Sequence, residues 1–174
     1  KATFQFNVTA PSYWKVVSNQ TTPSPVKVDD KRSVWNFAPT PVISSYITAL
    51  IAGPYVETRS QLTSSNGKVV PLGVFSRASL AKYMDADYVF EKTRQGFEFF
   101  EKQFDQPYPF EKYDQLFVPE FNAGAMENAG AVTFTESYVF RSKVTDAIRE
   151  RRVVTILHEL AHMWFGDLVT MKWW

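Results

Sequence analysis

The sequence predicts an α+β fold, and three observations support this prediction. Proline-punctuated, strand-like runs fill the first third of the chain. Two more strand-like runs follow, and from about Ser79 the apolar spacing becomes helical. The composition fits a folded protein, because 45% of the 174 residues are hydrophobic, 21% are charged, and the formal net charge is only +1.

Residues 1–52 have the pattern of part of an all-β unit. Apolar and polar residues alternate in the first run, which Pro11 interrupts. Four runs have the character of short strands: Phe4–Val8, Tyr13–Val17, Val34–Phe37 and Ser45–Ala52. Gly53-Pro54 then marks a domain boundary, because such a pair interrupts regular structure and the pattern changes after it. We therefore expect a second unit over residues 53–174.

The second unit opens with a hairpin and a long helix. Strands are expected at Tyr55–Leu62 and Lys68–Phe75, joined by a turn in which Asn66-Gly67 favours a tight reversal. A helical stripe follows, with apolar members three, four, six or seven residues apart: Leu80, Tyr83, Met84, Phe90, Phe97, Phe100 and Phe104. We interpret this stripe as hydrophobic core and not as a cofactor site.

A second helix is expected at the end of the unit. Three features precede it: a strand at Gln115–Val118, a segment of small residues at Asn122–Gly130, and a strand at Val132–Thr135. The helix spans Asp146–Phe165, with Thr145 or Asp146 as the N-cap and Gly166 just past its end. Because its second half is apolar nearly all round, we expect that half to be buried.

The composition excludes several classes of function. The chain has no Cys, so any metal must be held by nitrogen and oxygen ligands, and the chain has only two His. The near-neutral charge gives no basic surface for nucleic acid. The longest apolar stretch, Ile43–Ala52, is far shorter than the ~20 residues of a membrane-spanning helix. We expect neither a nucleic-acid partner nor a transmembrane segment.

The signals for cellular location are weak. The lack of Cys favours a cytoplasmic location. Asn7 and Asn19 begin Asn-x-Thr patterns, which would be glycosylation acceptors in a secreted protein, but so short a pattern recurs by chance. The chain starts at Lys1 and shows no leader, which is typical of a mature form or of a piece of a longer chain.

A metal-binding pattern lies in the second helix. His158 and His162 are four residues apart, so both imidazoles project from one face and can share a small cation. Imidazole suits zinc, and zinc lowers the pKa of a bound water. Glu159 can take the proton of that water as it attacks a carbonyl, which is the role of the acid in H-E-x-x-H. The pattern predicts metal-assisted hydrolysis.

The alternative reading is a pair of core histidines satisfied by neighbouring carbonyls. The metal is favoured because both His of the chain fall inside the pattern, and unpaired polar groups on an apolar helix are costly to bury. A catalytic zinc site normally takes three protein ligands, so the third must be a carboxylate. Three upstream acids fit by type, and spacing alone leaves them open: Glu120, Glu127 and Glu136.

Two motifs together resemble the zinc aminopeptidases of the aminopeptidase N family. Gly124–Asn128 (GAMEN) resembles the exopeptidase signature of that family, and it precedes the HELAH segment His158–His162. Flanking segments also resemble the family: Pro107–Phe110, Met163–Asp167 and Val169–Trp174. The resemblance implies the tail of a β-rich N-terminal domain over residues 1–52 and the first part of a thermolysin-like catalytic domain over residues 53–174.

The resemblance also implies a role for each motif residue. His158 and His162 would be zinc ligands, and Glu159 the general base. Glu127 would bind the free α-amino group of a peptide, since a carboxylate pairs with an ammonium. The remaining motif residues would hold the substrate, mostly through their backbone, as an added strand: Gly124, Ala125, Met126 and Asn128.

Some groups that the family uses would lie outside this chain. The third zinc ligand, a glutamate, and the transition-state tyrosine would follow Trp174, and a further amine-binding residue would precede Lys1. The resemblance thus implies a parent protein that removes N-terminal residues from peptides with a free N-terminus, whereas the 174 residues alone would be inactive. The alternatives are a zinc endopeptidase or epoxide-opening relative, and a scaffold module with a vestigial metal motif.

Overall fold

The computed structural model describes residues 1–172. Over these residues the elements follow in this order: β1 (Asn7–Pro11), β2 (Lys15–Ser18), β3 (Val26–Lys27), β4 (Arg32–Asn36), η1 (Ser45–Ile47), β5 (Leu50–Gly53), β6 (Tyr55–Thr63), β7 (Val69–Arg77), η2 (Ala78–Tyr83), α1 (Ala86–Phe104), β8 (Tyr113–Val118), β9 (Ala125–Met126), β10 (Ala131–Thr135), η3 (Glu136–Tyr138) and α2 (Asp146–His162). The mixture of sheets and helices agrees with the predicted α+β class. The last two residues of the predicted flank Val169–Trp174 lie outside the described residues.

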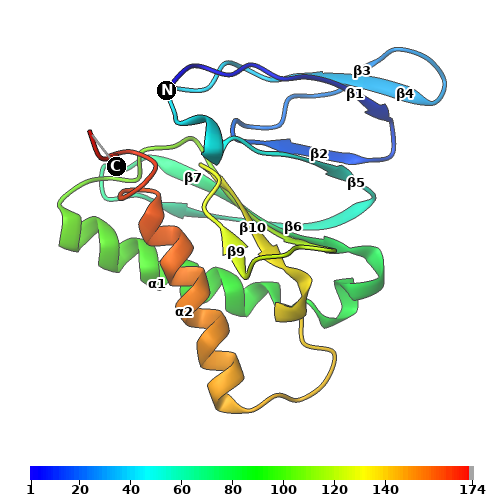
Figure 1. Ribbon diagram of the computed structural model, residues 1–174. Coiled ribbons are helices and arrows are strands. Elements are labelled where there is room, and N and C mark those ends of the chain that lie inside the picture. The colour runs from blue at the N-terminus through cyan, green and yellow to red at the C-terminus, as the bar shows by residue number, and fades with distance from the viewer. Residues whose placement is uncertain (173–174) are drawn as a thin grey trace.

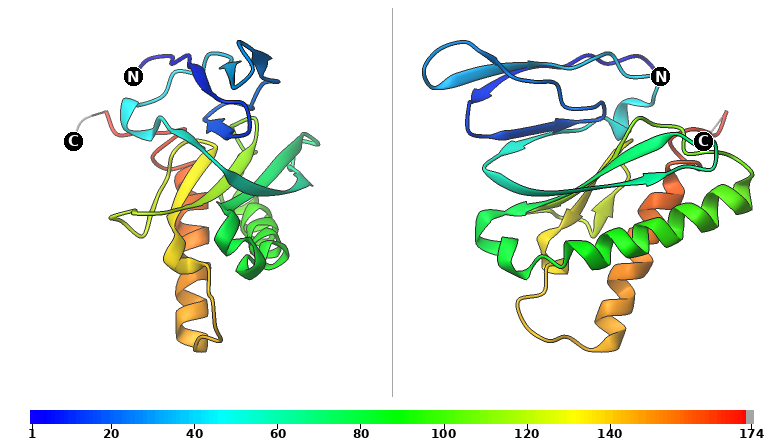
Figure 2. Two further views of the ribbon diagram at one scale, coloured as in Figure 1. Left: turned by 90° about the vertical axis from the view of Figure 1, so that its right-hand side faces the viewer. Right: turned by 180° about the vertical axis from the view of Figure 1, so that it is seen from behind.

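A five-stranded sheet forms the middle of the molecule, between the strands β1 to β5 and the two helices (Figure 1). Its strand order is β6-β7-β8-β10-β9. The strands β7, β8 and β10 are parallel, and β6 and β9 run antiparallel at the two edges. Parallel strands need a crossover connection, which α1 provides between β7 and β8. The helices α1 and α2 cross each other on the side away from β1 to β5 (Figure 2).

Each face of this sheet packs against a different part of the chain. In β8, Phe117 belongs to the core that the sheet shares with α1 and α2, whereas Leu116 belongs to a smaller core shared with Val17 of β2. Successive side chains of a strand point to opposite faces, so the strand contributes to both cores. All residues of β8 are buried, as expected for a strand in a sheet covered on both faces.

The predicted hairpin and aromatic core are confirmed. Gly67 has a φ of +84° and donates its N–H to the Ser64 carbonyl at 2.8 Å, which closes a tight turn between β6 and β7. Glu101 of α1 accepts a hydrogen bond from the Ser65 N–H at 2.8 Å, so the turn is tied to the helix. The aromatic stripe contributes to the core, and Phe97 within it is buried.

Two predicted elements begin differently from expectation. The expected strand Ser45–Ala52 starts as the 3₁₀ turn η1, in which the Thr48 N–H bonds to the Ser45 carbonyl, and only its end pairs as β5. The helix expected from Ser79 starts as the 3₁₀ helix η2. The extended backbone of Met84 separates η2 from α1.

The first strand and the second helix also require correction. β1 starts at Asn7, after the expected alternation has begun, and includes Pro11. α2 is buried along one face only, since Leu160 is buried while Val154 is 59% exposed and His158 is exposed. The helix contacts α1 and the sheet on that one face, so apolar composition alone overestimated its burial.

The predicted boundary at Gly53-Pro54 falls between β5 and β6, and the assignment of the two sides to separate domains stays a prediction. No helix within residues 1–172 combines the length and the apolar character that crossing a bilayer requires.

Candidate active site

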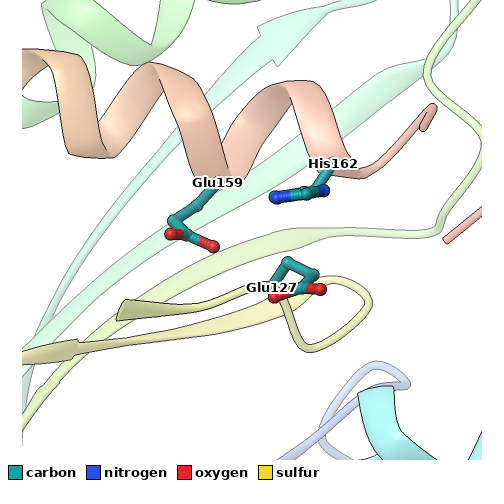
Figure 3. A group of neighbouring side chains, drawn as sticks. All are labelled: Glu127, Glu159 and His162. Atoms are coloured by element: carbon teal, nitrogen blue, oxygen red, sulfur yellow. The ribbon is translucent and has the colours of Figure 1, made fainter. Parts of the chain in front are cut away.

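The C-terminal turns of α2 carry three of the predicted site residues, His158, Glu159 and His162. Thr145 is the N-cap of this helix, and its hydroxyl accepts a backbone N–H of the first turn. Beyond His162, Gly166 adopts a φ of +127° and turns the chain back on itself. Figure 3 shows Glu159 and His162 on this end of α2, facing Glu127.

The two imidazoles lie side by side, as the four-residue spacing predicted. Nε2 of His158 is 3.1 Å from Nε2 of His162. Nδ1 of His162 is 2.9 Å from the Phe165 carbonyl oxygen, to which it donates its proton. This hydrogen bond fixes the tautomer, so the lone pair of the His162 Nε2 is available to a metal ion.

Glu127 approaches His162 from the opposite wall of the site. It directly follows β9, which is held by antiparallel pairing with β10. One carboxylate oxygen each of Glu127 and Glu159 and one ring nitrogen of His162 all lie within 4.8 Å of one another. Residues far apart in the sequence therefore converge on one small volume.

The GAMEN segment lies at an edge of the central sheet. Because β9 is the last strand, the outer side of Ala125 and Met126 has no strand beside it within residues 1–172. Gly124 accepts the N–H of Thr135 at 3.0 Å on the inner side. The Asn128 side chain donates from Nδ2 to the Thr48 carbonyl at 3.2 Å, which anchors the segment to the N-terminal part of the chain. An extended peptide could add to this edge as a further strand.

Glu159 is held in an environment that disfavours its charged form. Its residue is 6% exposed, and its Oε2 has no hydrogen-bond partner among the described residues. Burial and then the negative charge of Glu127 raise the pKa of Glu159 to about 7, against the opposing effect of His162. A carboxyl with such a pKa can accept and release a proton near neutrality.

Two buried groups near Glu159 were not predicted. Asp167 is buried with neither carboxyl oxygen partnered within residues 1–172, and the buried Tyr113 hydroxyl likewise has no partner there. Burial, followed by the charges of Glu127 and Glu159, raises the pKa of Asp167 to about 8. In the sequence, Asp167 follows Gly166 and looks like an ordinary loop residue. Its burial depends on the fold and cannot be predicted from its neighbours along the chain.

The donor set fits a zinc ion. Two ligands, each about 2.0–2.1 Å from one tetrahedral ion, would lie roughly 3.3 Å apart. The two imidazole Nε2 atoms are 3.1 Å apart, close to that separation. The unpartnered carboxylate oxygen of Glu159 also suits a neighbouring cation. His158 and His162 are thus the residues that could hold the metal.

The other two acids that spacing left open lie elsewhere. Glu136 forms an ion pair with Arg77, in which Nη2 and Oε1 are 2.6 Å apart. Glu120 is an exposed turn residue with a φ of +55°. Of these three acids, Glu127 is the one that the described residues bring to His162.

Comparison with known proteins agrees with the resemblance seen in the motifs. Residues 88–174 match the peptidase family M1 domain. The whole chain is 65% identical over 174 residues to aminopeptidase N of Streptomyces lividans and spans 20% of that protein. It is 37% identical to aminopeptidase N of Canis lupus familiaris and 38% identical to that of Homo sapiens, each over 179 residues and 18% of the relative. The chain therefore spans about a fifth of the length of these relatives.

Proposed function

The chain belongs to peptidase family M1, and from this membership we propose that the whole protein is a zinc-dependent aminopeptidase. It would hydrolyse the N-terminal peptide bond of peptides with a free N-terminus. The observation that carries the proposal is the approach of Glu127 to Glu159 and His162, within 4.8 Å. Glu127, which can pair with an ammonium, thereby lies beside the proposed general base Glu159 and the proposed metal ligand His162.

The residues on α2 would have two roles in hydrolysis, metal binding and proton transfer. His158 and His162 would hold the zinc through Nε2, and the Phe165 carbonyl keeps the His162 ring in position. When bound, the ion supplies Lewis-acid chemistry, since it polarises a carbonyl and lowers the pKa of water. Glu159 takes the proton of the attacking water on its carboxylate and delivers it to the leaving amine.

The GAMEN segment would supply substrate binding. The Glu127 carboxylate pairs with the α-ammonium of the first residue, which places the first peptide bond beside Glu159. Ala125 and Met126 offer the free edge of β9 to the extended substrate. This arrangement explains why only one residue would be removed at a time.

A pair of matched peptides tests the proposal in the whole protein. The free peptide should be cleaved and its N-acetylated counterpart should not, and E127A should lower kcat/KM for the free peptide at least about tenfold. E120A, which removes an exposed acid outside the site, is the matched control. Equal cleavage of both peptides would favour the endopeptidase alternative. A protein without zinc at neutral pH would favour the scaffold alternative.

Two further expectations stay predictions. The 174 residues alone are expected to bind zinc weakly and to turn over no peptide, which zinc titration and a peptide assay beside the whole protein would test. The cytoplasmic location is likewise a prediction, to be tested by fractionating cells that make the whole protein.

A further inference from the structure

Tyr46 reaches the candidate site from the N-terminal part of the chain. It lies in the middle of η1, a turn that both views of the ribbon place beside the end of α2 (Figures 1 and 2). A Cβ placed on Gly166 would lie 3.6 Å from the Tyr46 hydroxyl and 3.1 Å from Nδ1 of His162. The hydroxyl and the His162 ring therefore border the same glycine. The residue is 54% exposed, so its side chain can be reached from solvent.

Two contacts fix η1 against the segment that carries Glu127. The Ala129 N–H donates to the Ile47 carbonyl at 3.1 Å. The Asn128 side chain donates to the Thr48 carbonyl at 3.2 Å. The residues just after Tyr46 are thereby bonded to the residues just after Glu127, so η1 lies beside the segment that carries Glu127.

A buried amide holds this junction together. Asn19 is 4% exposed, and its Nδ2 donates to the carbonyls of Ile47 and Ala129, both at 2.9 Å. Its Oδ1 accepts the N–H of Ala49 at 3.0 Å. One side chain therefore ties η1 to the loop after Glu127, so the position of Tyr46 relative to Glu127 is defined by the fold.

The electrostatics of the Tyr46 hydroxyl agree with this placement. Partial burial and then the negative charges of Glu127 and Asp167 raise the pKa of this hydroxyl above its ordinary value. Each of these effects favours the protonated hydroxyl. Tyr46 can therefore act as a hydrogen-bond donor toward the Glu127 carboxylate.

We infer that Tyr46 is a positioning residue for Glu127 in recognition of the substrate amine. A carboxylate is an acceptor with several lone pairs, so it can receive the Tyr46 hydroxyl and still pair with an ammonium. The donated bond would hold the carboxylate in one rotamer and keep it ionised for the amine. This inference rests on the proposed function, because it assumes that Glu127 binds the α-ammonium.

The test compares two inhibitors on the whole protein: an amino-acid hydroxamate and its analogue without the α-amino group. In the wild-type protein the amino compound should bind more tightly. Y46F removes only the hydroxyl, and a hydrogen bond to a charged group is worth about 1.5–3 kcal/mol, so we expect the amino compound to lose about tenfold or more in affinity. The analogue should keep its affinity, because it does not use Glu127.

Y13F is the matched control, since Tyr13 is 74% exposed and far along the chain from the site residues. It should leave both affinities unchanged. An unchanged affinity ratio in Y46F would overturn the inference, as would an equal loss for both compounds, which would indicate a general structural effect. If the wild-type protein itself shows no preference for the amino compound, the proposed function fails instead. The two failures are therefore distinguishable.

Discussion

Glu127 and Glu159 face each other across the candidate site, with an oxygen of each carboxylate within 4.8 Å of the other. Two like charges at this separation repel, and the charge of Glu127 adds to burial in raising the pKa of Glu159 to about 7. A positive group between or beside them would relieve this repulsion. The proposed function would supply two such groups, a metal ion on the α2 side and a substrate ammonium on the β9 side.

Replacing Glu159 by Gln should separate catalysis from metal binding. The variant keeps the shape of the side chain and removes the proton acceptor, so we expect kcat of the whole protein to fall about 10²- to 10⁴-fold. Zinc content should not change, because His158 and His162 remain. Steady-state kinetics and metal analysis measure the two effects. E150Q changes an exposed acid on the same helix and should behave as wild type. Near-normal turnover by E159Q would exclude its role as the base.

Replacing His162 by Ala should remove the response of stability to zinc. A ligand that binds only the folded state stabilises it in proportion to RT ln(1 + [L]/Kd). Zinc added after chelation should raise the Tm of the wild-type protein, and it should raise that of H162A little or not at all. Thermal scans with chelator and with zinc make the comparison. An equal rise in both proteins would place the zinc elsewhere.

The metal motif could be predicted because local geometry decides it. Four residues on a helix bring His158 and His162 to one face whatever the rest of the fold does, and the structure has their Nε2 atoms 3.1 Å apart. The approach of Glu127 could not be derived in this way, because it depends on the pairing of β9 with β10 at the edge of the sheet. Only the resemblance to a family singled out Glu127 before the fold was known.

Tyr46 and Asp167 were missed for the same physical reason. Tyr46 lies in the run Ser45–Ala52, which was expected to be a strand, and its position at the site depends on long-range bonds between η1 and the loop after Glu127. Asp167 is buried because the chain reverses at Gly166, after which the Asp167 N–H donates to the His162 carbonyl at 3.1 Å. Neither position follows from the spacing of residues along the chain.

Replacing Asn19 by Ala should destabilise the junction between η1 and the central sheet. Asn19 donates to the Ile47 and Ala129 carbonyls and accepts from Ala49. The truncation leaves the buried Ala49 N–H and Ala129 carbonyl without this partner, whereas the Ile47 carbonyl keeps its bond from the Ala129 N–H. We expect the free energy of unfolding, measured by urea denaturation, to fall by at least about 1–3 kcal/mol. N7A, at an exposed position, should change it little. Equal effects of the two substitutions would contradict the role of Asn19.

The ion pair between Lys15 and Glu57 predicts a pH dependence of stability. Lys15 Nζ is 2.5 Å from Glu57 Oε1, and Arg59 pairs with the same carboxylate. Partial burial alone would raise the Glu57 pKa, but the two cations outweigh it and lower the pKa below its ordinary value. The pair therefore stabilises the fold above the unfolded-state pKa of Glu, about 4.3, and this contribution is lost as the pH falls through the folded-state pKa.

Replacing Glu57 by Gln isolates this contribution. At pH 7 we expect E57Q to be less stable than wild type by at most about 1 kcal/mol, since the pair is partly exposed. The difference should shrink as the pH is lowered below about 4, because the wild-type carboxylate is then protonated. Urea denaturation at a series of pH values measures it. A difference that does not vary with pH would assign the effect of the substitution to packing.

Breaking the ion pair between Arg152 and Asp85 should destabilise the fold more than breaking a fully exposed pair. Arg152 of α2 is fully buried, and its Nη1 and Nη2 donate to the two carboxylate oxygens of Asp85 at 2.7 and 2.6 Å. Asp85 precedes α1, but its side chain makes no capping hydrogen bond, so its contribution lies in the ion pair. D85A should leave the buried guanidinium without its carboxylate, although the Tyr138 carbonyl still accepts from Nη1 at 3.2 Å. Removing one partner costs about 3–5 kcal/mol for a fully buried pair.

Because the Asp85 carboxylate is partly exposed, we expect the loss in D85A to lie at the lower end of that range, as measured by urea denaturation. D87A, which removes an exposed acid from the first turn of α1, is the matched control. The double variant D85A/R152M should recover part of the loss, because Met fills apolar space without a charge. If the double variant were less stable than D85A, packing of the Arg152 stem would matter more than the unpaired charge.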